Sequence, residues 1–64
     1  MIRIDELKGE IKSHGMTQAD VAKAIGIHPV TFSKKLNKGV LNSNEMEALI
    51  IVLSIENPSK IFFA

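Results

Sequence analysis

The sequence predicts an all-α fold, a compact arrangement of four to five helices in which residues 1–64 form a single domain. Apolar residues recur at spacings of three and four along most of the chain, which is the period of an amphipathic helix. Residues that favour helix starts, and glycines that favour helix ends, separate these segments. Apolar and polar residues alternate cleanly nowhere, so we expect no strand. A chain of 64 residues has room for one domain and not for two.

The first helix is predicted from Ile4 onward, because Ile4, Leu7 and Ile11 form one apolar stripe. Gly15 is expected to end it, since glycine readily takes the left-handed conformation that follows many helices. The resulting helix has one face for a core and one for solvent.

Thr17 marks the start of the second helix, predicted over residues 18–25. Threonine favours the position just before a helix, and Asp20 stands where a capping box needs a return hydrogen bond. Gly26 is expected to break this helix. Its inward-facing residues are predicted to be Val21, Ala22 and Ile25.

A third helix is predicted at about residues 28–38. Pro29 is favoured at the first helical position, where the missing N–H costs nothing. Phe32 and Leu36 lie four residues apart and therefore share its buried side.

The fourth helix is predicted to begin at Asn42 or Ser43, with Glu45 three residues after Asn42. A final short turn of helix, over residues 58–63, is expected to start at Pro58. The inner face of the fourth helix is expected to hold Met46, Leu49, Ile50 and Leu53.

Positive charge is concentrated in one short segment. The whole chain has a net charge of only +1, but residues 28–39 contain three lysines and no acidic residue, which gives +3 there. Residues 40–64 contain one lysine against three glutamates, a net charge of −2. A short basic segment on a predicted helix is typical of a surface that contacts nucleic acid.

The residue inventory argues against an enzyme. The chain has no cysteine, its two histidines lie in different segments, and it contains no glycine-rich phosphate loop and no metal-ligand spacing. We therefore expect no catalytic residue, cofactor, metal or small-molecule substrate. The first residues do not resemble a signal peptide, and the apolar run at 49–53 is too short to span a membrane. These features predict a cytoplasmic protein without a membrane partner.

Residues 17–38 are the most informative segment, two short helices joined by a tight glycine turn. Such helices cross at a steep angle, and Ala22 offers a small side chain where they approach. With Ile27 and Phe32 facing inward, the third helix keeps an outer stripe that is small, polar and basic. Such a stripe can enter the major groove of DNA without steric conflict. Its residues are Pro29, Val30, Ser33, Lys34 and Asn37.

This segment resembles the helix-turn-helix of the Cro and phage-repressor family, whose fold is lambda-repressor-like. The likeness covers roughly residues 4–55, and residues 58–63 resemble the Pro-x-x-Ile-Phe-Phe tail of small phage or prophage regulators. The resemblance implies a sequence-specific transcription regulator that binds double-stranded operator DNA in a phage lysis–lysogeny switch. The matching residues are Thr17-Gln18, Val21-Ala22, Ile25-Gly26-Ile27, Phe32-Ser33 and Leu36-Asn37.

The resemblance also implies a DNA-binding role for individual positions. Gln18 is expected to contact a phosphate, and Pro29 and Val30 match positions that often touch base edges. Ser33 and Lys34 follow one turn later on the same face. The helix end supplies further phosphate contacts, expected from Asn37 and Lys38 and also considered for Lys35.

The sequence departs from the family pattern at three positions. Pro29 cannot make the side-chain hydrogen bonds of the glutamine or arginine found there in relatives. His28 replaces a smaller capping residue, and Lys35 stands where an apolar residue is common. Base reading at position 29 and the DNA sequence preferred are therefore left open.

Apolar residues near the C-terminal end exceed what one small core requires. Residues 49–52 are apolar on every side of the predicted fourth helix, and residues 61–63 add Ile-Phe-Phe. One of the two phenylalanines is expected to fold back onto the core. The remainder predicts an association surface, which joins a homodimer or holds a repressor protein. Its residues are Ile51, Val52, Ile61, Phe62 and Phe63.

Two functions therefore remain open from the sequence. The first is a DNA-binding transcription regulator. The second is a protein-binding modulator, an antirepressor that captures a phage repressor through the same fold. Net charge, the proline at position 29 and the apolar tail keep the second alternative in play.

Overall fold

Five helices form the regular secondary structure of residues 2–63, the part of the chain that this computed structural model describes. The all-α prediction is confirmed, and each helix lies where the sequence predicted one. α2 ends one residue earlier than expected, because Ile25 is its C-cap. In chain order the helices are α1 (Ile4–Ser13), α2 (Gln18–Ala24), α3 (Pro29–Lys38), α4 (Ser43–Val52) and α5 (Pro58–Phe62).

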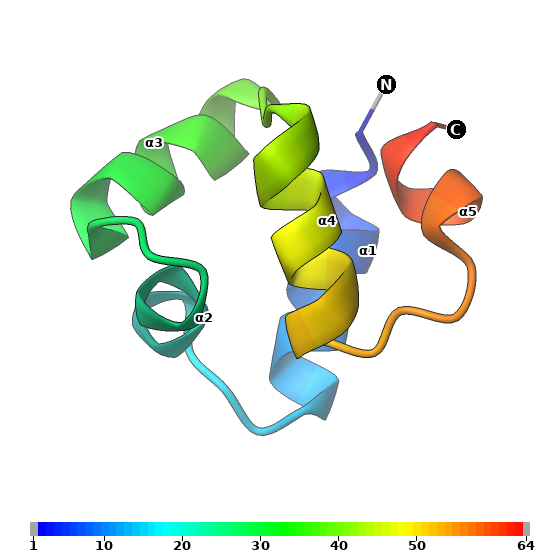
Figure 1. The fold of residues 1–64 in the computed structure, drawn as a ribbon, viewed down its shortest axis with the longest axis horizontal. Coiled ribbons are helices and arrows are strands. Elements are labelled where there is room, and N and C mark those ends of the chain that lie inside the picture. The colour runs from blue at the N-terminus through cyan, green and yellow to red at the C-terminus, as the bar shows by residue number, and fades with distance from the viewer. Residues whose placement is uncertain (1, 64) are drawn as a thin grey trace.

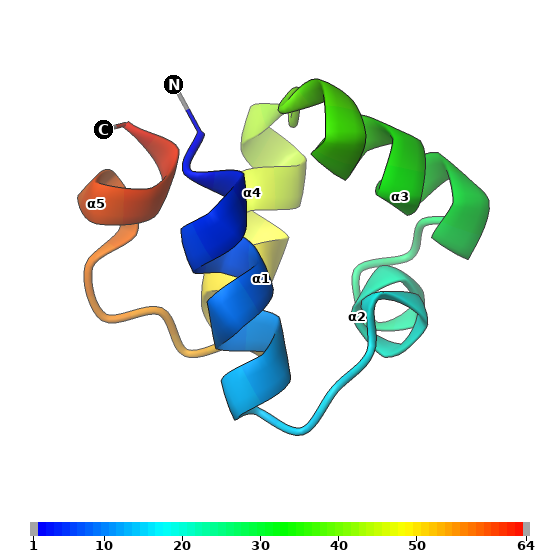
Figure 2. The same ribbon diagram turned by 180° about the vertical axis from the view of Figure 1, so that it is seen from behind.

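α1 and α4 occupy the middle of the molecule, with α2 and α3 at one edge and α5 at the opposite edge (Figure 1, and from behind in Figure 2). The backbone N–H of Arg3 donates a hydrogen bond of 2.6 Å to the carbonyl oxygen of Ile61, so the segment before α1 lies against α5. The radius of gyration is 10.3 Å, close to the roughly 10.7 Å expected for a compact chain of this length. Within residues 2–63, no helix combines the length and apolar character needed to cross a membrane.

Two helices begin with the capping boxes that the sequence predicted. The hydroxyl oxygen of Thr17 accepts the backbone N–H of Asp20 at 3.1 Å, and the Asp20 carboxylate accepts the N–H of Thr17 at 2.9 Å. Asn42 and Glu45 make the same reciprocal pair before α4, at 2.8 and 2.9 Å. Because these bonds satisfy N–H groups that a helix leaves unpaired, they fix where α2 and α4 start.

α1 to α4 all end in a turn closed by a left-handed residue. After α2 this residue is Gly26, with φ of +79°, and the next N–H donates to the carbonyl oxygen of Ala22 at 2.8 Å. After α4 the position is taken by Ser54, with φ of +48°, and the next N–H donates to the carbonyl oxygen of Ile50 at 3.0 Å. This is the Schellman arrangement, in which glycine usually occupies the left-handed position. Ser54 therefore holds a conformation that a side chain makes unfavourable.

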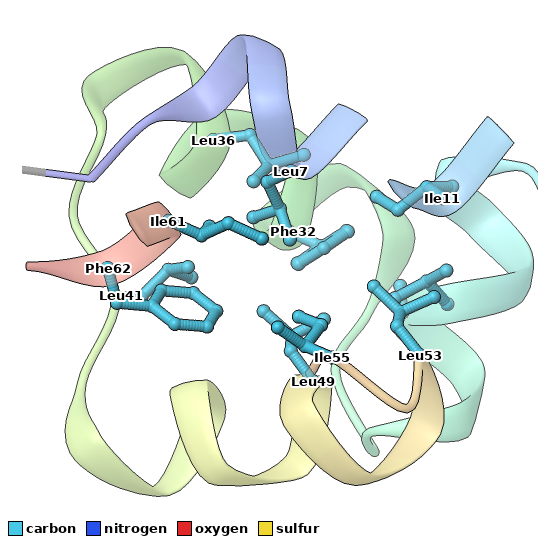
Figure 3. Close-up of a cluster of buried hydrophobic side chains, with 12 residues drawn as sticks. Leu7, Ile11, Phe32, Leu36, Leu41, Leu49, Leu53, Ile55, Ile61 and Phe62 are labelled. Carbon is cyan, nitrogen blue, oxygen red and sulfur yellow. The ribbon is translucent and has the colours of Figure 1, made fainter. Parts of the chain in front are cut away.

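The core is a single cluster of apolar side chains to which all five helices contribute (Figure 3). Figure 3 shows Ile61 and Phe62 of α5 pointing inward, toward side chains of α1, α3 and α4. No polar or charged residue is buried among residues 2–63. The buried side chains are Leu7, Ile11, Val21, Ala22, Phe32, Leu36, Leu41, Leu49, Leu53, Ile55, Ile61 and Phe62.

Candidate nucleic-acid interface

The pair formed by α2 and α3 holds α3 at the edge of the molecule. In Figure 1, α2 is seen almost end-on while α3 lies across the view, so the two helices cross steeply. α2 and α3 pack directly against each other, and Ala22 and Phe32 are completely buried. Since Gly26 makes the turn between them, α3 is fixed from behind and its outer face stays open to solvent.

The outer face of α3 carries most of the stripe that the sequence predicted. Val30, Lys34 and Asn37 are exposed, and their spacings of four and three residues place them on one side of the helix. Lys38 is exposed at the helix end, whereas Ser33 is only half-buried at the margin. α3 contains no acidic residue. This face therefore combines two exposed cations with hydrogen-bonding groups and one exposed apolar side chain.

The start of α3 is closed by His28 and Pro29. The Nδ1 atom of His28 accepts a hydrogen bond of 3.2 Å from the backbone N–H of Val30, so this nitrogen carries no proton in the capping role. Pro29 is the first residue of the helix and is half-buried. The expectation that His28 serves as a helix-start residue is confirmed, and Pro29 offers a partner only part of its ring.

Lys35 is not part of the open face, although the sequence suggested that it could act together with Lys34 and Lys38. Its ammonium group forms an ion pair with the Oε2 atom of Glu45, across the turn that joins α3 to α4. Burial raises the pKa of Glu45, but the Lys35 ammonium and the Asn42 N–H outweigh this effect and hold the pKa below its usual range. Glu45 is therefore ionised at neutral pH. The only sequence signal for this pair is a Lys and a Glu near the two ends of a short turn.

Gln18 lies at the first position of α2, as predicted for a phosphate contact, and is half-buried. Asp20 is exposed in the same first turn. The backbone N–H and then the hydroxyl group of Thr17 lower the pKa of Asp20, so a negative charge stands near Gln18 at neutral pH. A phosphate at Gln18 would meet this charge, which makes α3 the stronger part of the face.

The predicted association surface needs a correction. Ile61 and Phe62 are buried, Phe62 with only 2% of its surface exposed, so these two side chains belong to the core and face no partner. Val52 is half-buried and packs against the core. Ile51 and Phe63 remain open, 78% and 70% exposed. The turn of α5 decides this outcome, because it directs adjacent residues to different sides.

Phe63 also borders a pocket of about 330 Å³ against α4. Apolar side chains and one carboxylate surround this space. Ile51 is also exposed on α4. We use the name apolar face of α4 for Ile51 and Phe63 together with the pocket between Phe63 and the helix. The pocket is lined by Ser43, Met46, Glu47, Ile50 and Phe63.

A second hollow, of about 510 Å³, lies between α1 and the segment from Ser54 to Ile61. Its charged lining is mainly acidic, with Glu6, Glu10 and Glu56 beside one lysine. Among residues 2–63, no group of three or more His, Asp or Glu side chains is arranged to hold a metal ion. This hollow involves neither α2 nor α3.

Comparison of the chain with protein-family models, with curated proteins and with solved structures finds no match. The chemistry of two faces therefore carries the functional argument. One is the basic, polar outer face of α3. The other is the apolar face of α4, defined by exposed Ile51 and Phe63 together with the pocket between Phe63 and the helix.

Proposed function

We propose that this protein is a sequence-specific DNA-binding transcription regulator of the helix-turn-helix type, in which α3 enters the major groove of operator DNA. The observation that carries the proposal is the outer face of α3, where Val30, Lys34 and Asn37 lie exposed together on a helix without acidic residues. The likeness to small phage regulators supports a role in a lysis–lysogeny switch.

Each exposed residue of α3 has a chemistry that suits one part of the duplex. Lys34 can donate to the acceptor edge of guanine, and Val30 can pack on the methyl group of thymine. Asn37 and Lys38, toward the helix end, suit phosphate oxygens, which orient a protein on DNA without reading its sequence. Half-buried Ser33 lies at the margin of this contact.

A homodimer would complete the arrangement. Helix-turn-helix regulators commonly bind two half-sites about one helical turn apart, roughly 34 Å, with one recognition helix in each. The apolar face of α4 supports such an association, because exposed apolar patches mark interfaces in soluble proteins. Phe63 follows α5, which lies at the opposite edge of the molecule from α3, so one protomer can contact both a partner and DNA.

The decisive experiment is a titration against duplex DNA at several salt concentrations. Because Lys34 in the groove and Lys38 at a phosphate each bring one positive charge to the duplex and displace about one counterion, the log–log slope of affinity against salt is expected to be about −2 per protomer. Lys34→Ala is expected to cost about 1–3 kcal/mol and to relax preference at one base pair, whereas Lys38→Ala weakens all sequences alike. Lys60→Ala, on α5 at the opposite edge, is the matched control and leaves affinity unchanged.

A flat salt response of the wild-type protein would contradict DNA binding. A loss of sequence preference in Lys38→Ala, with Lys34→Ala unaffected, would contradict the assignment of the two lysines. These results are separable because the first concerns whether the protein binds DNA and the second concerns how.

The exposed apolar face of α4 favours a second candidate function, a modulator that captures a repressor protein. In that case Ile51 and Phe63 would contact a different protein rather than a second copy of this chain. The two candidates differ in a simple measurement. The modulator shows no salt-sensitive affinity for bulk duplex DNA, and its association with a repressor is lost when Ile51 and Phe63 become polar.

A further inference from the structure

The three lysines of α3 are in different electrostatic situations. Lys34 and Lys38 are exposed and form no ion pair with any side chain of residues 2–63. Lys35 lies about 100° further round the helix than Lys34, on the side that faces α4. Its side chain is 34% exposed, and its ammonium group is bound to the carboxylate of Glu45.

Glu45 is held in place independently of Lys35. Its Oε1 atom accepts the backbone N–H of Asn42 at 2.9 Å, while its own N–H donates to the Asn42 side chain at 2.8 Å. Both carboxylate oxygens are thus engaged, one by the cap of α4 and the other by Lys35. With only 10% of its side chain exposed, Glu45 cannot follow Lys35 outward.

We propose that Glu45 is a positioning residue that withholds Lys35 from DNA and ties the second half of α3 to the start of α4. This inference rests on the proposed DNA-binding function and specifies which charges act in it. The α3 face then presents two cations to the duplex instead of the three that its sequence contains. Lys35 leaves its carboxylate for a phosphate only by breaking a partly buried pair, whereas Lys34 and Lys38 have no such pair to break.

The first experiment needs no DNA. Limited acetylation of the folded protein, followed by mass spectrometry, measures the relative reactivity of each lysine. Lys35 is expected to react several times more slowly than Lys34, and Glu45→Gln is expected to raise its rate to that of Lys34. Glu47→Gln, on the exposed side of the same helix, is the control and leaves the pattern unchanged. Equal rates for Lys34 and Lys35 in the wild type would overturn the proposal.

The second experiment compares salt slopes of DNA binding. Lys34→Gln is expected to reduce the magnitude of the log–log slope by about 0.9, and Lys35→Gln is expected to leave it unchanged. Glu45→Gln frees Lys35 and steepens the slope by up to about 0.9. Adding Lys35→Gln to Glu45→Gln is expected to return the slope to the wild-type value.

If Glu45 has only a structural role, the opposite pattern is expected: Glu45→Gln weakens DNA binding without steepening the salt slope. That result would overturn the withholding of Lys35, as would a smaller slope in Lys35→Gln. If the wild-type protein shows no salt-dependent binding at all, the proposed function fails. The acetylation rates still decide whether Glu45 sequesters Lys35, so the two failures are distinguishable.

Discussion

α3 and α4 are helices of equal length, ten residues each with a side-chain cap at the start, yet α3 carries lysines and no acidic residue whereas α4 carries glutamates and no lysine. α3 keeps its apolar side chains on the buried side, apart from Val30, and exposes lysine and asparagine. α4 buries Leu49 but leaves Ile51 exposed, and Phe63 borders a pocket against the same helix. One small core can therefore support two faces of different chemistry, because each helix needs only one side for packing.

The largest expected effect comes from the two adjacent phenylalanines beside α4. Phe62→Ala removes a ring that is 98% buried and is expected to cost about 3–5 kcal/mol. A domain of this size has a total stability of roughly 3–10 kcal/mol, so much of the variant will be unfolded. Phe63→Ala changes an exposed ring and is expected to stay within about 0.5 kcal/mol. Urea denaturation followed by circular dichroism measures both. Equal losses in the two variants would break the distinction between core and surface.

The second effect concerns association through the apolar face of α4. Ile51→Gln together with Phe63→Gln is expected to keep the helical content and weaken association by at least about 3 kcal/mol, roughly a hundredfold. Sedimentation at micromolar concentrations measures it. Val30→Gln makes the same kind of change on α3 and is expected to leave association unaltered while impairing DNA recognition. A wild-type protein that stays monomeric and recovers no partner would remove this face from the comparison.

A smaller effect on stability is expected at the start of α4, where Glu45 lies. Glu45→Gln keeps the cap but loses the charge, and is expected to cost about 1 kcal/mol at neutral pH. Because the folded-state pKa of Glu45 is lowered, its contribution is present above the unfolded-state pKa and disappears as pH falls through the folded-state value. The stability difference between wild type and variant should therefore shrink below about pH 4.5. Glu47→Gln is the matched control, and a difference that persists in acid would contradict this role.

The smallest effect concerns the turn that follows α4. Ser54→Gly removes a side chain from a left-handed residue and is expected to stabilise the domain by about 0.5–1 kcal/mol without changing either face. Ser59→Gly, inside α5, is expected to destabilise it, because glycine disfavours a helical position. The shift in the urea midpoint of each variant measures the effect. A loss of stability in Ser54→Gly would show that its hydroxyl group matters more than its backbone strain.

The helices were predictable because their limits depend on neighbouring residues. Thr17 and Asp20, three positions apart, determine the start of α2 within one turn of chain, and Gly26 determines its end. The outer face of α3 followed from the spacing of its residues once Phe32 and Leu36 were assigned to the core. Local chemistry was sufficient in each case.

The features that the sequence did not reveal are contacts between separate helices. Phe62 and Phe63 have the same side chain and adjacent positions, and only the approach of α5 to α1 decides which ring is buried. The pairing of Lys35 with Glu45 likewise depends on how the turn after α3 directs α4. Neither contact leaves a repeating pattern in the sequence, so periodicity and capping rules could not find it.

The hydrogen bond from Arg3 to Ile61 has a consequence for the order in which the core closes. Ile61 and Phe62 complete the same core that Leu7 begins, so a chain cut before residue 61 leaves part of the apolar side of α1 uncovered. A contact between residues this far apart in sequence costs more loop-closure entropy than one between neighbouring helices, so we expect α5 to join the core after the local contacts have formed.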